Sequence, residues 1–166
     1  MNLFVLRHGL AVEPETRGYD DASRPLTSEG KSKLKAIATA MLKLDLKFDL
    51  ILSSPYTRAR ETAEIVAQRL DLCDKLELTG SLQPNGDFRS LINLVGKRAP
   101  VENLLLVGHE PYLSELITLL VFGESESVVV MKKTGLAKLA ITSLKMGRCA
   151  LLEWLMTPKQ LVLIGE

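Results

Sequence analysis

The feature that most constrains the fold is an unbroken apolar run at residues 3–6, which ends abruptly in Arg7, His8 and Gly9. Such a run is typical of a strand buried on both faces, as in a parallel sheet. Ligands of open parallel sheets collect outside the carboxyl ends of the strands, where Arg7 and His8 fall. Gly9 allows the backbone to turn sharply beside them. The run predicts a buried strand with functional side chains at its end, although chance polar residues at an exposed strand end would look the same.

The two side chains suit phosphoryl chemistry. Arg7 offers a planar fork that matches phosphate oxygens and keeps its charge at any working pH. His8 offers a nitrogen nucleophile or base near neutral pH.

Length and composition indicate one globular domain, 1–166, with an ordinary 46% of apolar and 25% of charged residues. The formal net charge of +1 gives no basic field for nucleic acid and no bias toward a membrane surface. The apolar runs are too short to span a bilayer, and no signal-peptide pattern precedes the first strand. Cys73 and Cys149 fit neither a disulfide framework nor a metal site, so we expect reduced thiols and a cytoplasmic protein.

Two further apolar runs also end in chemically competent residues. The run at 48–52 leads into Ser53, Ser54 and Pro55, and Pro55 suits the first position of a helix that carries Arg58 and Arg60. These two arginines lie two positions apart and point to different sides of the helix, so one is expected to face the site while the other pairs outward, for example with Glu64.

The third run, at 103–107, ends in Gly108 and His109, and Glu110–Pro111 begins another helix. Strands and helices alternate along most of the chain: a helix capped by Thr27 or Ser28, a short strand at 76–78, a loop at 80–86 and a helix capped by Asp87. Residues 128–131 are apolar but too short to assign.

The chain then changes character. Strands at 135–144 and 148–155 are joined so closely, around 145–147, that they must be antiparallel, and an apolar tail at 159–166 should dock on the body. The pattern predicts an α/β fold: a three-layer α/β/α domain whose sheet is mostly parallel, with an antiparallel C-terminal hairpin.

Parallel strands place their carboxyl ends on one edge, so Arg7, His8, Arg58 and His109 should share one pocket. These residues, in the segments Arg7-His8-Gly9, Ser53-Ser54-Pro55-Tyr56-Thr57-Arg58-Ala59 and Gly108-His109, resemble the histidine phosphatase superfamily, the phosphoglycerate mutase-like fold. The resemblance implies that His8 is the transiently phosphorylated nucleophile. It also implies that Arg7, Arg58 and His109 hold the phosphoryl oxygens.

Two features are similar to the SixA-type phosphohistidine phosphatases: the short chain without cap insertions, and the segment Arg24-Pro25-Leu26-Thr27-Ser28-Glu29-Gly30. This resemblance implies that Gly9 and Arg24 are further phosphate or substrate contacts. A surface arginine before a helix is the alternative for Arg24.

The loop after the third strand departs from the wider superfamily. Gln83 occupies roughly the place where mutases and many phosphomonoesterases have a glutamate acid. An alkoxide leaving group needs such an acid, whereas phosphoimidazole needs it less because the ring can be protonated before the bond breaks. Asp21, Asp87 and Glu110 remain candidate acids, with Asp21 the first, although loop or cap chemistry is the preferred interpretation of each.

The predicted function is therefore a phosphatase acting on phosphohistidine of a partner protein, with a histidine-containing phosphotransfer domain as the model partner and inorganic phosphate as the product. No metal or cofactor is required, because the arginines neutralise the phosphoryl charge. The alternatives are a small-molecule phosphomonoesterase and, less favoured, a mutase or a non-catalytic phosphate-binding module.

Overall fold

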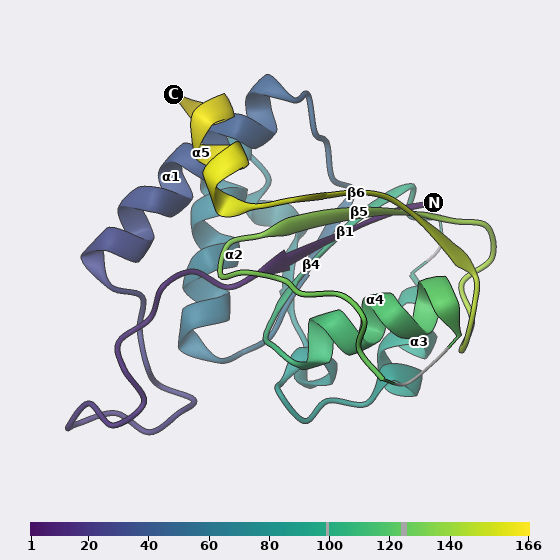
Figure 1. Cartoon of the computed structure of the whole chain (residues 1–166), viewed down its shortest axis with the longest axis horizontal. Helices are drawn as coiled ribbons and strands as arrows, with labels where there is room; N and C mark the ends of the chain where they lie inside the picture. Colours follow the sequence, from purple (N-terminus) through teal and green to yellow (C-terminus); the bar gives the residue numbers. More distant parts are fainter. Residues whose placement is uncertain (99, 124–125) are drawn as a thin grey trace.

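The strands build a single mixed sheet with helices on both faces (Figure 1). The computed structural model describes residues 1–98, 100–123 and 126–166. Its strands are β1 (Asn2–Arg7), β2 (Leu50–Ser53), β3 (Leu76–Leu78), β4 (Asn103–Gly108), β5 (Leu136–Ile141) and β6 (Ala150–Met156). Its helices are α1 (Ser28–Lys43), α2 (Thr57–Leu70), α3 (Phe88–Gly96), α4 (Tyr112–Phe122) and α5 (Pro158–Gly165), with short 3₁₀ turns η1 (Cys73–Lys75) and η2 (Gly80–Leu82).

The six strands follow the order β3-β2-β4-β1-β5-β6. The pairs β3–β2, β2–β4 and β4–β1 are parallel, whereas β5 runs antiparallel to both β1 and β6. The α/β fold with a mostly parallel sheet and an antiparallel C-terminal hairpin is therefore confirmed. The unbroken apolar run of β1 is buried as predicted, because the strand lies between β4 and β5 with helices over both faces.

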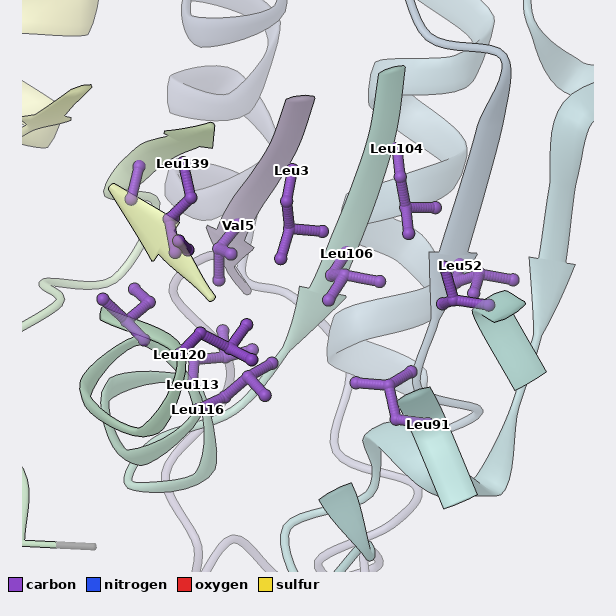
Figure 2. Close-up of a cluster of buried hydrophobic side chains, with 14 of the residues drawn as sticks. Leu3, Val5, Leu52, Leu91, Leu104, Leu106, Leu113, Leu116, Leu120 and Leu139 are labelled. Carbon is purple, nitrogen blue, oxygen red and sulfur yellow. The ribbon is translucent and has the colours of Figure 1, made fainter. Parts of the chain in front are cut away.

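Alternate residues of the central strands point into two separate cores. On one face, Leu3 and Val5 of β1 pack with Leu104 and Leu106 of β4 against leucines of α3 and α4, as Figure 2 shows. On the other face, Phe4 and Leu6 pack under α1, α2 and α5. Figure 1 shows the same division, with α3 and α4 on one side of the sheet and α1, α2 and α5 on the other. Apolar side chains on both faces explain why these strands lack polar alternation.

Local capping decides where the helices begin. Thr27 caps α1 by accepting from the Gly30 amide at 3.0 Å, and Asp87 caps α3 by accepting from the Ser90 amide at 2.8 Å, both at predicted positions. The predicted start of α2 at Pro55 is wrong by two residues: Tyr56 is the N-cap and Thr57 the first helical residue. The Ser54 hydroxyl accepts from the Tyr56 amide at 3.3 Å, so Pro55 lies inside a turn that precedes the helix.

The C-terminal segment is more regular than its sequence suggested. The predicted docking tail is the helix α5, which begins with a capping box between Thr157 and Gln160 and buries Leu161 against α1. The hairpin strands are shorter than predicted, so the connection spans 142–149, and the register shifts between Lys138 and Leu139.

The segment 126–131, which includes the residues 128–131 left unassigned from sequence, is an irregular strap that crosses from α4 toward the carboxyl end of β1 (Figure 1). In the described ranges, no helix has both the length and the apolar character that crossing a membrane requires.

Candidate active site

Three parallel strand ends meet at one edge of the sheet. Arg7 of β1 pairs with Gly108 of β4, and Val107 of β4 pairs with Ser53 of β2. The amide of His8 donates to the Gly108 carbonyl at 3.0 Å. His8 and His109 leave adjacent strands, and their ring centroids lie 5.1 Å apart. The structure therefore brings the ends of β1, β2 and β4 together, as the sequence predicted.

His8 is held as a neutral imidazole with a defined tautomer. Its Nδ1 lies 2.7 Å from the Gly9 carbonyl oxygen, which can only accept, so Nδ1 carries the proton. Nε2 keeps its lone pair and accepts from Arg58 Nε at 3.3 Å. Burial, with the charges of His109, Arg58 and Arg7 adding to it and the Gly9 hydrogen bond opposing it, lowers the pKa of His8 to about 3. At neutral pH the Nε2 lone pair is therefore available as a nucleophile.

Arg58 lies in the first turn of α2 with a side chain only 5% exposed. Besides His8, it bonds to the loop before α1: Nη1 donates to the Asp21 carbonyl at 2.5 Å and Nη2 to Asp21 Oδ2 at 3.2 Å. Arg60 instead points outward and pairs with Glu64 at 3.6 Å, as the two-residue spacing predicted. Of the two arginines, Arg58 is the one that faces His8.

His109 is fully buried and contacts Ser54 and Tyr56. Its Nε2 hydrogen-bonds with the Ser54 hydroxyl at 2.8 Å, and the Tyr56 ring packs on it with centroids 5.3 Å apart. The Arg58 guanidinium lies 5.3 Å from the same Tyr56 ring. Burial and the charge of Arg58 lower the pKa of His109 to about 3, so this histidine is also neutral before an anion binds.

Arg7 reaches across to the strap. Its Nη1 donates to the Met131 carbonyl at 2.7 Å, and the Thr134 amide donates to the backbone carbonyls of Arg7 and His8 at 3.1 and 3.2 Å. Burial lowers the pKa of Arg7, with the charge of Glu110 opposing it. Among the described residues, Arg7 Nε and His109 Nδ1 are buried atoms with no hydrogen-bond partner.

Arg24 joins the site through Asp21. Its Nε and Nη2 both donate to Asp21 Oδ1, at 3.1 and 2.6 Å, and its Nη1 donates to the Val12 carbonyl at 2.7 Å. The Asp21 carboxylate therefore bridges Arg24 and Arg58. Burial alone would raise the pKa of Asp21, but the Arg24 hydrogen bonds and the Arg58 charge lower it overall, so the group is an ionised partner of two arginines.

Gly9 supports His8 rather than offering its own amide to a ligand. Its amide donates to the Thr62 hydroxyl at 3.0 Å, and that hydroxyl donates to the Arg58 carbonyl at 2.6 Å. A Cβ at Gly9 would come within 2.7 Å of Leu34 Cδ1, so close packing, not a left-handed turn, explains the glycine.

The other candidate acids are engaged in capping. Asp87 holds the Ser90 amide, and its hydrogen bonds with Ser90 lower the pKa of its carboxyl. Glu110 accepts from the Ser114 amide at 3.1 Å at the start of α4. Gln83 follows η2 at the predicted edge, since the Thr79 amide donates to the Ser53 carbonyl at 2.8 Å and carries this loop along the end of β2.

Several site residues were missed from sequence. Ser54 and Tyr56 stood inside a recognised motif without an assigned contact, and their place directly after a buried strand was a usable signal. Thr62 is one turn beyond Arg58 on the same helix, a spacing that also could have indicated it. Met131 contributes only its backbone carbonyl from an irregular segment, and no side-chain pattern reveals that. Within the described residues, no three His, Cys, Asp or Glu side chains group as metal ligands.

Comparisons with known proteins show the family and the fold. The family model of the histidine phosphatase superfamily (branch 1) matches residues 3–83. A phosphohistidine phosphatase SixA homolog from Haemophilus influenzae is 36% identical over 127 residues, covering 70% of this chain and 75% of the relative. SixA from Escherichia coli is 29% identical over 132 residues, covering 75% and 77%. A structure of the protein histidine phosphatase SixA with tungstate superposes with a TM-score of 0.84 at 26% identity, covering 97% of this chain and 99% of that one.

The chain belongs to the histidine phosphatase superfamily, and it is a phosphatase. Within the superfamily it is of the SixA type, sharing the phosphoglycerate mutase-like fold of SixA over nearly its whole length.

Proposed function

We propose that the protein removes the phosphoryl group from a phosphohistidine on a partner protein, with His8 as the phosphorylated intermediate. The two SixA relatives that bear the name phosphohistidine phosphatase support the substrate class. The tetrahedral oxyanion tungstate in the SixA structure supports an anion site on this fold.

The reaction proceeds in two transfers. The substrate imidazole is first protonated by solvent on its free ring nitrogen; His8 Nε2 then attacks phosphorus, the N–P bond of the substrate breaks, and the imidazole departs neutral. Water then attacks the phosphorus of phosphorylated His8, the second N–P bond breaks, and inorganic phosphate leaves. Arg7, Arg58 and His109 hold the phosphoryl oxygens, and Arg7 Nε and His109 Nδ1 are the buried nitrogens that such oxygens would satisfy.

The main support for a phosphohistidine substrate is that each candidate acid already bonds to other groups of the protein. Asp21 is ionised between two arginines, Asp87 caps α3, and Glu110 accepts from the Ser114 amide in the first turn of α4. Gln83 stands where ester-cleaving relatives place a glutamate, and an amide cannot deliver a proton and recover it. A site without a poised acid suits a leaving group that is protonated near neutral pH, such as imidazole, and not an alkoxide.

Two segments that bond to the arginines of the site, the strap through Met131 and the loop before α1 through Asp21, are taken as the rim of the site, and both expose apolar side chains that suit a protein substrate. Val128 and Val130 of the strap are 63% and 77% exposed, and Tyr19 of the loop before α1 is 44% exposed. We propose that a phosphorylated domain, with a histidine-containing phosphotransfer domain as the model, rests on this rim while its phosphohistidine reaches His8. The free thiols of Cys73 and Cys149 support a reducing, cytoplasmic location.

The nucleophile can be tested by trapping. Rapid-quench mass spectrometry during turnover of a phosphohistidine protein should find phosphate on the peptide that contains His8, and His8→Ala should lose both label and turnover. Label on another residue, or turnover by the His8→Ala variant, would refute the proposal.

The substrate class needs a separate comparison. We expect kcat/KM for a phosphohistidine protein to exceed that for glycerol phosphate, because a missing acid costs an alkoxide on the order of 10²–10⁴ in rate. Gln83→Glu should raise ester hydrolysis selectively. If the unmodified protein prefers an ordinary ester, the small-molecule phosphomonoesterase is the correct function.

A further inference from the structure

The Asp21 carboxylate bonds to two arginines, Arg58 and Arg24, that the proposed function assigns to the phosphoryl group or substrate. One of its oxygens bonds to Arg24 Nη2 at 2.6 Å and the other to Arg58 Nη2 at 3.2 Å. A guanidinium fork binds carboxylate and phosphate oxygens in the same geometry. In this arrangement Arg58 Nε bonds to His8, Nη1 to the Asp21 backbone carbonyl and Nη2 to the Asp21 carboxylate, so the carboxylate holds one of the two terminal nitrogens.

The carboxylate is placed so that it can leave. The Asp21 side chain is 55% exposed, whereas the side chains of its partners Arg58 and Arg24 are 5% and 12% exposed. The acid therefore lies on the solvent side of both arginines, on a loop whose residues 13–21 are mostly exposed. Water reaches the carboxylate but not the buried arginines, so the Asp21 oxygens are the members of the pairs that a doubly charged anion can replace from solvent.

We propose that Asp21 is a positioning residue that acts as an internal anion: it holds Arg58 and Arg24 in place before substrate arrives and is displaced by the phosphoryl group. This inference rests on the proposed function, since it assumes that the site binds phosphate. Displacement favours release of product, because the carboxylate returns to the arginines as inorganic phosphate leaves. It also assigns Asp21 a role in which it stays ionised, distinct from proton donation.

Binding of inorganic phosphate, followed by isothermal titration calorimetry, tests the exchange. Asp21→Asn removes the competing charge and keeps the shape, so phosphate should bind roughly 5- to 10-fold more tightly, the size expected for loss of one exposed ion-pair competitor. Asp21→Glu retains the charge and should stay near the affinity of the unmodified protein. Asp20→Asn is the matched control, since it removes one negative charge from the neighbouring residue. The Asp20 carboxylate accepts from the Ser23 amide and does not bond to the arginines.

A purely structural role predicts the opposite sign. If Asp21 only braces the loop, Asp21→Asn should weaken phosphate binding, because Arg58 and Arg24 lose their support. Weaker or unchanged affinity, or equal tightening in Asp20→Asn, would overturn the inference. Failure of the unmodified protein to bind phosphate would instead count against the proposed function.

A second measurement needs no variant. Arg24 Nε–H donates to Asp21 Oδ1 at 3.1 Å, so its NMR resonance reports on that contact. Titration of the unmodified protein with inorganic phosphate should shift this resonance in parallel with occupancy of the site. A site that fills while the Arg24 resonance stays unchanged would contradict displacement.

Discussion

At the scale of single residues, the chemistry of the site depends on the hydrogen-bond partner of each histidine and arginine nitrogen. The order of residues in the chain was enough to group Arg7, His8, Arg58 and His109, because each follows the end of a buried parallel strand. Their hydrogen bonds were not predictable, since the Gly9 carbonyl that fixes the His8 tautomer and the Asp21 carboxylate between two arginines depend on loop geometry. Sequence therefore located the reactive groups and left their protonation and pairing to the fold.

The two arginines of α2 should differ sharply in effect. Arg58→Ala removes a buried cation beside His8 and should lower turnover about 10²–10³-fold, the size seen when one donor to a developing charge is lost. Arg60→Ala removes a surface pair with Glu64 and should cost no more than about 0.5 kcal/mol of unfolding free energy, with turnover unchanged. Steady-state kinetics and urea unfolding of both variants measure the contrast; the reverse ranking would mean that the other arginine faces the phosphate.

The two histidines should make stability depend on pH between 7 and 5. Their pKa values are about 3 in the folded protein, against an ordinary 6.5. Above pH 6.5 both histidines are therefore mostly neutral in the folded and in the unfolded chain, and they do not lower the free energy of unfolding. As the pH falls toward 5, only the unfolded chain takes up protons, and each histidine should cost about 2 kcal/mol of unfolding free energy. Urea unfolding at the two pH values measures this loss.

His109→Gln should remove about half of that pH dependence, because the chain contains only two histidines. The carboxyl groups of Asp20, Asp21 and Asp87 have lowered pKa values and therefore titrate below this window. An unchanged slope in His109→Gln would show that another group is responsible.

At the scale of elements, signals close together in the chain were the dependable ones. Thr27 and Asp87 were identified as caps because the residues that they bond to lie three positions away. The same kind of signal at Thr157 and Gln160 was overlooked because α5 is only an eight-residue helix, stabilised largely by packing on α1. Contacts between distant segments, such as Arg7 with Met131, leave no local pattern to predict from.

Gly30 in the first turn of α1 should show the cost of close packing. Alanine normally stabilises a helix by about 1 kcal/mol relative to glycine, but a Cβ here would overlap the Leu10 carbonyl beside Gly9. Gly30→Ala should therefore destabilise the protein by about 1–3 kcal/mol, as overpacking does. Gly96→Ala, at the end of α3 with open space around the added atom, should be neutral or stabilising. Urea unfolding measures the change in unfolding free energy for both variants. Equal changes would contradict a clash at Gly30.

At the scale of the whole molecule, the parallel strands bring Arg7, His8, Arg58 and His109 together at their carboxyl ends, at one edge of the sheet. In Figure 1 the loop before α1 extends from the carboxyl ends of the strands, and the strap runs from α4 toward them. The opposite edge holds the amino end of β1, where Asn2 pairs with Ala140 and Ala140 pairs with Leu151. A protein docked over the active site can therefore contact exposed apolar side chains near the carboxyl ends of the strands, but not those near the amino end of β1.

Val130→Ser should weaken the reaction with a phosphoprotein and spare small substrates. Loss of an apolar contact of this size should lower kcat/KM for the phosphoprotein roughly fivefold, with free phosphohistidine unaffected. Leu151→Ser is the matched control, since Leu151 is 66% exposed against 77% for Val130 but lies at the far edge. Equal losses in the two variants, or a loss with free phosphohistidine, would refute docking on this rim.

The placement of β1 between two cores has a consequence for how the protein fluctuates. Residues of β1 pack in both cores, so we expect the two helical layers to open as one cooperative unit that includes the strand ending in Arg7 and leading to His8. The loop that carries Asp21 is mostly exposed and can open locally while that unit stays folded. We therefore expect the proposed nucleophile to lie in a part of the chain that opens only with both cores, and its anionic neighbour on a loop that can open locally.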